Sequence, residues 1–311
     1  MNRRNFLTAA AGAAVLHGSG LGHVSALANA PAATPEFDFL FFTDTHLQPE
    51  LNAAKGCDMA FRKMQGTRAV DFAIQGGDHV FDTLAVPKAR SLALWDLYDK
   101  TQQDLSLKVY HAIGNHDVMG LKTASGMEPT DPMYGKKFYQ DHIGKTYSSF
   151  DHKGVRFFIL DSVQMTPDRD YEGRIDAAQL QWLATELATV PKGTPVIVVT
   201  HIPLVTAVDA YMARETTPRP HYQIAVVNAS EVLPLFEGHN VLAVLQGHTH
   251  IQEQVDWHGV PYITGGAVCG NWWKGTRLGT HEGYMVVSVR GGTVKTRYET
   301  YGFQTVDPHN T

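Results

Sequence analysis

The sequence has little cysteine and lacks two common signatures of catalysis. Only Cys57 and Cys269 occur among its 311 residues, so a cluster of thiolate metal ligands is excluded. The two could pair in an oxidising compartment, but the tendency of cysteine to be buried favours two free thiols. A glycine-rich phosphate loop with a following lysine and a serine nucleophile elbow are both absent, which excludes the functions that those motifs mark.

The charge balance also excludes some partners. Charged residues make up 18% of the chain and the net charge is −5. No strongly basic character is present to attract nucleic acid or an anionic membrane, so nucleic-acid binding is not predicted. The hydrophobic share of 43% is that of an ordinary globular protein. Histidine is abundant, with 16 copies, which raises the expectation of a metal site without locating it.

The N-terminus has the features of an export signal. Arg3 and Arg4 precede a stretch of small, modestly apolar residues, and Ala26-Leu27-Ala28 offers a cleavage site. This segment resembles bacterial Tat signal peptides, so we expect a Tat signal peptide at 1–28, a linker at 29–35, and the Tat export machinery as a partner. A membrane anchor is a weaker alternative, because glycines and histidines interrupt the stretch. We therefore expect a periplasmic or secreted mature protein that is not membrane-embedded.

The remainder alternates runs of strand length with helical patterns. Runs of strand character cover residues 36–42, 69–75, 107–113, 146–151, 155–161, 195–199 and 241–245. Helical patterns cover residues 53–66, 87–105, 176–190 and 229–236. Asp176 is the expected N-cap of the third helix. The pattern predicts an α/β core extended by a β-rich segment at 260–301, within a single domain at 36–303 that precedes a tail at 304–311.

Five of the predicted strands end in side chains that can bind metal. These candidates are Asp44, His46, Asp78, Asn115, His116, His201, His248 and His250. Open α/β sheets place their sites beyond the carboxyl ends of their strands, so these side chains should meet. Oxygen and imidazole donors without thiolate suit Mn, Fe, Zn, Co or Ni. Seven of these side chains as ligands are too many for one tetrahedral zinc and suit two divalent ions that share a carboxylate.

The order of these motifs resembles that of a known superfamily. Asp-x-His, Gly-Asp, Gly-Asn-His-Asp, a single His after a strand and Gly-His-x-His, between Asp44 and His250, are similar to the calcineurin-like metallophosphoesterase motifs. The resemblance implies a four-layer α/β/β/α sandwich with a dinuclear site. It implies a first metal held by Asp44, His46 and His250, a bridging Asp78, and a second metal held by Asn115, His201 and His248. It also implies that His116 is the general acid or binds phosphate, steadied by Asp117.

The same resemblance implies hydrolysis of a small-molecule phosphoric ester by a hydroxide that bridges the two metals. We expect a phosphodiester to be favoured over a monoester. A phosphomonoesterase and a non-catalytic metal-binding scaffold are the alternatives. Phe81 stands three residues after Asp78, where purple acid phosphatases have a tyrosine, so an iron–tyrosinate site is not expected.

Two features stay open on the sequence alone. Trp272 and Trp273 could belong to the core of the C-terminal segment or form a platform near the metals. His79 and His111 could support the metal ligands from behind.

Overall fold

The computed structural model describes residues 35–212 and 221–309. The predicted signal peptide and all of the linker except Pro35 lie outside the described residues. The described residues belong to a single compact unit, 34–311. Within them, no helix combines the length and the apolar character that a membrane span requires.

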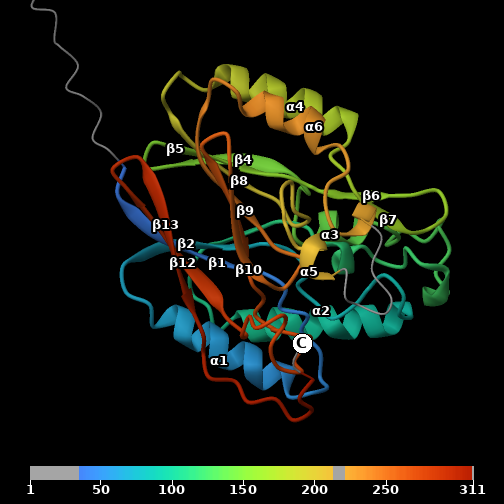
Figure 1. Ribbon diagram of the computed structural model, residues 1–311. Helices are drawn as coiled ribbons and strands as arrows, with labels where there is room; N and C mark the ends of the chain where they lie inside the picture. Colours follow the sequence, from blue (N-terminus) through green and yellow to red (C-terminus); the bar gives the residue numbers. More distant parts are fainter. Residues whose placement is uncertain (1–34, 213–220, 310–311) are drawn as a thin grey trace, which may run out of the picture. The chain divides into compact units, whose positions relative to one another are not determined.

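Two β-sheets form the centre of this unit (Figure 1). The first has the strand order β13-β12-β1-β2-β3, and the second the order β10-β11-β9-β8-β5-β4. The strands of the first sheet are β1 (Phe37–Phe42), β2 (Val70–Gln75), β3 (Val109–His111), β12 (Tyr284–Arg290) and β13 (Thr293–Glu299). Those of the second are β4 (Ser148–His152), β5 (Val155–Ile159), β8 (Pro195–Val199), β9 (Asn240–Gln246), β10 (Gln252–Trp257) and β11 (Val260–Gly265). A separate hairpin joins β6 (Val163–Met165) and β7 (Tyr171–Gly173).

Helices cover the outer face of each sheet, which confirms the predicted four layers (Figure 1). The helices beside the first sheet are α1 (Ala53–Gln65) and α2 (Lys88–Gln102). The helices beside the second are α4 (Ala177–Thr189) and α6 (Ala229–Val232). The ring of Phe61 on α1 contacts Phe42 of β1, and Trp182 on α4 contacts Phe158 of β5. Two short helices, α3 (Lys137–His142) and α5 (Asp209–Met212), lie in the connections.

The space between the sheets is filled by aromatic and β-branched side chains. Phe39 of β1 stacks on Phe72 of β2 and packs edge-on against Phe157 of β5, with ring centroids 5.0 and 5.6 Å apart. These three side chains are at most 2% exposed. Alternate residues of each strand therefore face the opposite sheet, while their neighbours face the helices.

The C-terminal strands are integral parts of the two sheets. β12 pairs with β1 in an antiparallel register that places Phe39 opposite Val287. β11 pairs in parallel with β9. The predicted β-rich extension thus completes both sheets.

Local sequence signals account for several boundaries and for what was missed. The carboxylate of Asp176 accepts a hydrogen bond of 2.8 Å from the backbone N–H of Gln179, which confirms the predicted N-cap. Strand β10 was not predicted because its sequence, Gln-Glu-Gln-Val-Asp-Trp, is mostly polar and lies at an exposed sheet edge. The hairpin of β6 and β7 was also missed, since each strand has only three residues.

Candidate metal centre

The carboxyl ends of five strands, from both sheets, bring the predicted ligands together. Asp78 follows β2 and lies between two groups of imidazoles. Its Oδ2 atom is 3.4 Å from His46 Nε2 on one side and 3.1 Å from His201 Nε2 on the other. The side chains of all three residues are at most 2% exposed. One buried carboxylate oxygen is therefore shared by both halves of the site.

The first half of the site contains Asp44, His46 and His250. Asp44 Oδ1 lies 3.2 Å from His250 Nε2 and 3.7 Å from His46 Nε2. The two Nε2 atoms are themselves only 3.1 Å apart. These are the three residues expected to hold the first metal, and the structure brings them into one cluster.

The second half contains His201, Asn115 and His248. His201 Nε2 lies 3.3 Å from the side-chain oxygen of Asn115. Asp78, His201 and His248 each offer a ligand atom within one group whose atoms lie no more than 4.8 Å apart. The predicted second set of ligands is thus also assembled, with Asp78 at its junction to the first.

Backbone carbonyls fix the orientation of all four imidazoles. The Nδ1–H groups of His46, His201 and His250 donate to the carbonyls of Phe81, Gly76 and Gly270, at 3.3, 2.8 and 2.8 Å. In His248 the roles of the nitrogens are reversed, because Nε2–H donates to Gln223 O at 2.7 Å. A carbonyl can only accept, so in the neutral form of each ring the other nitrogen is the one that carries a lone pair.

The donor set fits a cation. With both Nδ1 atoms protonated, the neutral rings of His46 and His250 direct lone pairs at each other across 3.1 Å. Asp44 Oδ1 is buried and finds no hydrogen-bond donor among the described residues. Facing lone pairs and an unpaired buried carboxylate oxygen are unfavourable unless positive charge lies between them. The ligand roles themselves stay a prediction.

Several of these residues adopt a strained backbone conformation. Left-handed φ values occur at Asp44, His46, Asp78, His248 and His250, between 39° and 71°. Such values are uncommon outside glycine and gather at functional sites. The backbone of Gly114 lies so close to Asp78 that only glycine fits there, because a Cβ atom on Gly114 would lie 2.1 Å from Asp78 Oδ1.

Burial and charge shift the ionisation of the site in opposite directions. Burial alone would lower the pKa of His201, but the carboxylates of Asp78 and Asp44 raise it to about 9. Burial opposes ionisation of Asp78, yet the imidazoles, His201 first, hold its pKa below the ordinary value. Burial lowers the pKa of His250 despite the nearby Asp44. Without a metal, a proton on His201 therefore offsets part of the negative charge of the two buried carboxylates.

His116 lies beside the clusters and is more accessible than the ligands. Its side chain is 17% exposed, and its Nδ1 atom lies 3.5 Å from Asp82 Oδ1. One of its nitrogens belongs to a group with ligand atoms of His46 and Asp78 that lie within 4.8 Å of one another. Burial tends to raise the pKa of Asp82, but its interaction with His116 lowers it overall. The imidazole of His116 thus lies near both a carboxylate and the cluster of candidate ligands.

The carboxylate of Asp117 contacts the backbone of two loops and the ring of His79. Its carboxylate accepts hydrogen bonds of 2.9 to 3.0 Å from the backbone N–H groups of Asp78, His79 and Gly114, and one of 2.8 Å from His79 Nδ1. It therefore ties the loop after β2 to the loop after β3. The short turn Asn115–Asp117 points successive side chains in different directions, so Asp82 lies beside His116 in its place.

Three supporting residues were missed or left open by sequence reasoning. Asp82 lies only four residues after Asp78, but spacing alone did not pair it with His116. His79 acts through Asp117, and its Nε2 atom lies 2.9 Å from His111 Nδ1. The prediction of free thiols is confirmed, since Cys57 and Cys269 are both buried and neither forms a disulfide.

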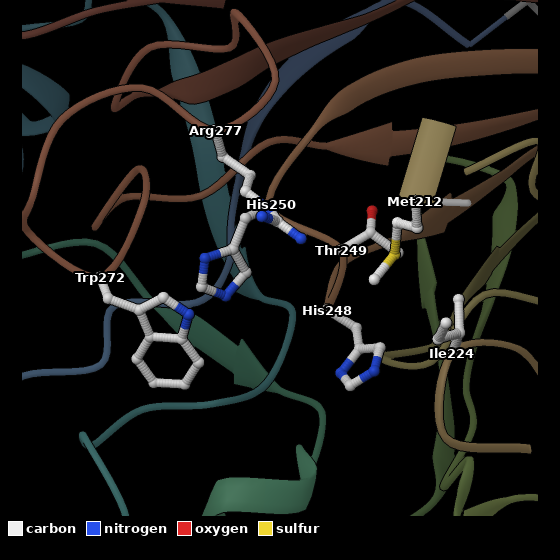
Figure 2. Close-up of a pocket in the computed structure, with 7 residues that line it drawn as sticks. All are labelled: Met212, Ile224, His248, Thr249, His250, Trp272 and Arg277. Carbon is white, nitrogen blue, oxygen red and sulfur yellow. The ribbon is translucent and has the colours of Figure 1, made fainter. Parts of the chain in front are cut away.

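A hollow of about 160 Å³ opens beside the first half of the site. Figure 2 shows its walls, with Trp272 and His250 on one side, Met212 and Ile224 on the other, and Arg277 reaching between them. His248 and Thr249 complete the lining. The hollow thus adjoins both halves of the metal centre.

A four-layer sandwich whose strand ends gather imidazoles around one shared carboxylate defines the class of dinuclear metal phosphoesterases. The family described as calcineurin-like phosphoesterase matches residues 37–252, which is more than half of the chain. The chain belongs to the calcineurin-like phosphoesterase family.

Three proteins illustrate the similarity. The cAMP/cGMP dual specificity phosphodiesterase of Mycobacterium tuberculosis is 32% identical over 117 residues, which cover 37% of this chain and 32% of that protein. A dimetal phosphatase from Danio rerio has a TM-score of 0.58 and 16% identity, covering 85% of this chain and 99% of its own. A purple acid phosphatase from yellow lupin has a TM-score of 0.59 and 13% identity. The match covers 89% of this chain and 54% of the lupin protein. At these identities the two structures confirm the fold alone.

Proposed function

We propose that the protein hydrolyses phosphoric esters in a reaction that depends on two divalent metal ions, with phosphodiesters favoured. The observation that carries this proposal is the position of Asp78. Its carboxylate is shared by two sets of buried imidazoles, and His116 lies next to that junction. The choice of a diester is supported by the partial similarity to a cyclic-nucleotide phosphodiesterase.

The candidate ligands would bind the two metal ions in two groups. Asp44, His46 and His250 would hold one ion, Asn115, His201 and His248 the other, and Asp78 would contact both. Such a pair of ions, of Mn, Fe, Zn, Co or Ni, supplies positive charge for the phosphate and lowers the pKa of water.

His116 contributes the proton chemistry in this proposal. As an imidazolium it donates a proton to the leaving oxygen or a hydrogen bond to a phosphate oxygen. Asp82 places a carboxylate 3.5 Å from the Nδ1 atom of this ring. Asp117 acts at a distance, because it fixes the loops that carry Asp78 and His116.

Turnover of paired substrates tests the proposal. Protein loaded with Mn²⁺ should release nitrophenol from bis(4-nitrophenyl) phosphate faster than from 4-nitrophenyl phosphate. The reverse ratio would make the protein a phosphomonoesterase. Hydrolysis of neither ester, with both ions bound, would favour a metal-binding scaffold of the same fold.

A variant of His116 separates binding from chemistry. His116→Ala should keep the metal content of the wild type and lose about 10²- to 10⁴-fold in kcat. Wild-type turnover in this variant would remove His116 from the mechanism.

We also propose that the protein is exported by the Tat machinery to the periplasm or beyond. The arginine pair and the small-residue stretch of residues 1–28 support this proposal. Replacing Arg3 and Arg4 together by lysine should leave the protein in the cytoplasmic fraction of a Tat-competent bacterium. Continued export of that variant would contradict the route.

A further inference from the structure

The two adjacent tryptophans, Trp272 and Trp273, have different environments. Trp273 belongs to the core, with its side chain fully buried and its Nε1–H donating to the carbonyl of His46 at 3.0 Å. Trp272 is half-buried and turned toward the metal centre. Both have left-handed φ values, of 55° and 68°, which direct the two indoles to different sides of the loop. The sequence had left both roles open, and the structure assigns one to each residue.

Trp272 lies over the histidines of the first half of the site. Its ring centroid is 3.9 Å from that of His46, 5.1 Å from that of His250 and 5.0 Å from that of His116. Phe81 supports the indole edge-on, at 5.8 Å. The indole of Trp272 therefore lies close both to the candidate metal ligands and to the proposed general acid.

The opposite wall of the hollow is apolar. Met212 and Ile224 line it, and they form a small hydrophobic cluster with Val208 and Ile251. Figure 2 shows both side chains across the hollow from Trp272. An organic group held here would contact an aromatic ring on one side and aliphatic or thioether groups on the other.

The described lining contains one cationic side chain. Arg277 contributes a guanidinium, and none of the described residues that line the hollow is an aspartate or a glutamate. A guanidinium suits an anion, while the indole and the aliphatic wall suit a flat apolar group. The lining therefore matches one molecule that carries both parts.

We propose that this hollow selects phosphoesters whose organic group is aromatic, with Trp272 as the surface on which that group packs. The proposal rests on the proposed function, because the phosphate must be held at the metal centre for its organic group to reach Trp272. It goes further by naming the substrate class and the residue that determines the preference.

Two phosphonates of equal charge provide the test without turnover. Phenylphosphonate and methylphosphonate differ only in the group that Trp272 would contact, and neither is an ester. Calorimetric titration of the Mn²⁺-loaded protein should show phenylphosphonate binding about tenfold more tightly. Equal affinity, or no binding of either compound, would overturn the proposal.

Variants of Trp272 test whether this residue determines the preference for phenylphosphonate. Trp272→Leu should reduce the tenfold ratio to below about threefold, while Trp272→Phe should retain most of it. Trp257→Leu is the matched control, because that tryptophan is 52% exposed on β10 and does not line the hollow. A full preference in Trp272→Leu would contradict the assignment.

The Trp272→Leu variant could also disturb His46, so its metal content is measured in parallel. If that variant loses metal, Met212→Ala tests the opposite wall of the hollow. The ratio of the affinities for phenylphosphonate and methylphosphonate should also fall in this variant. An unchanged ratio in Met212→Ala would then count against the hollow. Hydrolysis of bis(4-nitrophenyl) phosphate is scored separately. Turnover without a phenyl preference refutes only this inference, whereas a phenyl preference without turnover refutes only the proposed function.

Discussion

The space between the two sheets and the strand ends above it are equally buried, yet they differ in chemistry. Strand β1 contributes to both: Phe39 and Phe41 face the opposite sheet, and Asp44 and His46 follow the same strand into the metal centre. All four side chains have no exposed surface. Apolar burial stabilises the first region, whereas buried charge and left-handed backbone destabilise the second. The core therefore holds a geometry that the site residues would not adopt alone.

The largest expected effect falls on the site and spares the core. Asp78→Asn hardly changes the size of the side chain and keeps an oxygen that accepts from the backbone N–H of His116. Asparagine also tolerates the φ of 56° at this position. It removes the charge shared by both halves, so turnover of bis(4-nitrophenyl) phosphate should fall by more than about 10³-fold. A variant with wild-type turnover would contradict the shared role of Asp78.

The reverse effect is expected in the core. Phe157→Ala removes a fully buried ring that contacts Phe37, Phe39, Phe72 and Phe150. The free energy of unfolding should fall by about 3–5 kcal/mol. Turnover per folded molecule should stay near the wild-type value.

Val306→Ala provides the control for Phe157→Ala, because Val306 is 60% exposed. Its unfolding free energy should stay within about 0.5 kcal/mol of the wild type. A loss of stability as large as that of Phe157→Ala would mean that the assay does not report core packing.

The contrast between core and site explains what the sequence could predict. Strands β1, β2, β8 and β9 were predicted because buried parallel strands consist of continuous apolar runs. The polar residues that follow these strands marked the candidate ligands. Parallel strands place their carboxyl ends at the same edge of a sheet, so the residues after them come together there.

Contacts that depend on turn geometry were not predictable in this way. The family resemblance paired Asp117 with His116, whereas the structure places Asp117 in contact with His79 and Asp82 beside His116. The separation of Trp272 from Trp273 likewise depends on two left-handed residues in succession. Hydrophobic periodicity carries no information about either.

The next largest effect concerns the pH dependence of stability without metal. The carboxylates Asp78 and Asp44 raise the pKa of His201 to about 9 in the folded protein, against burial, from an ordinary value of 6.5. The stabilisation is fully present below about pH 6.5 and is lost as the pH rises through about 9. Urea unfolding of the metal-free protein should show a loss on the order of 3 kcal/mol across this range.

His201→Gln supplies the reference for that pH series. The variant lacks the titrating ring, so its stability should change less between pH 6.5 and 9. If the wild-type protein became more stable between pH 6.5 and pH 9, the predicted direction of the pH dependence would be wrong.

The smallest effect is expected at Asp82. Asp82→Asn removes the charge beside His116 and leaves the metal ligands in place, so kcat should fall about tenfold. Asp58→Asn, at an exposed ion pair with Arg62, is the control. An unchanged kcat in Asp82→Asn would show that Asp82 does not assist His116.

The most direct test of the central claim is a crystallographic map of the Mn²⁺-loaded protein that records the anomalous scattering of the metal. Two peaks are predicted on either side of the Asp78 carboxylate, one near Asp44, His46 and His250 and the other near Asn115, His201 and His248. A single peak, or peaks that do not contact Asp78, would contradict the account.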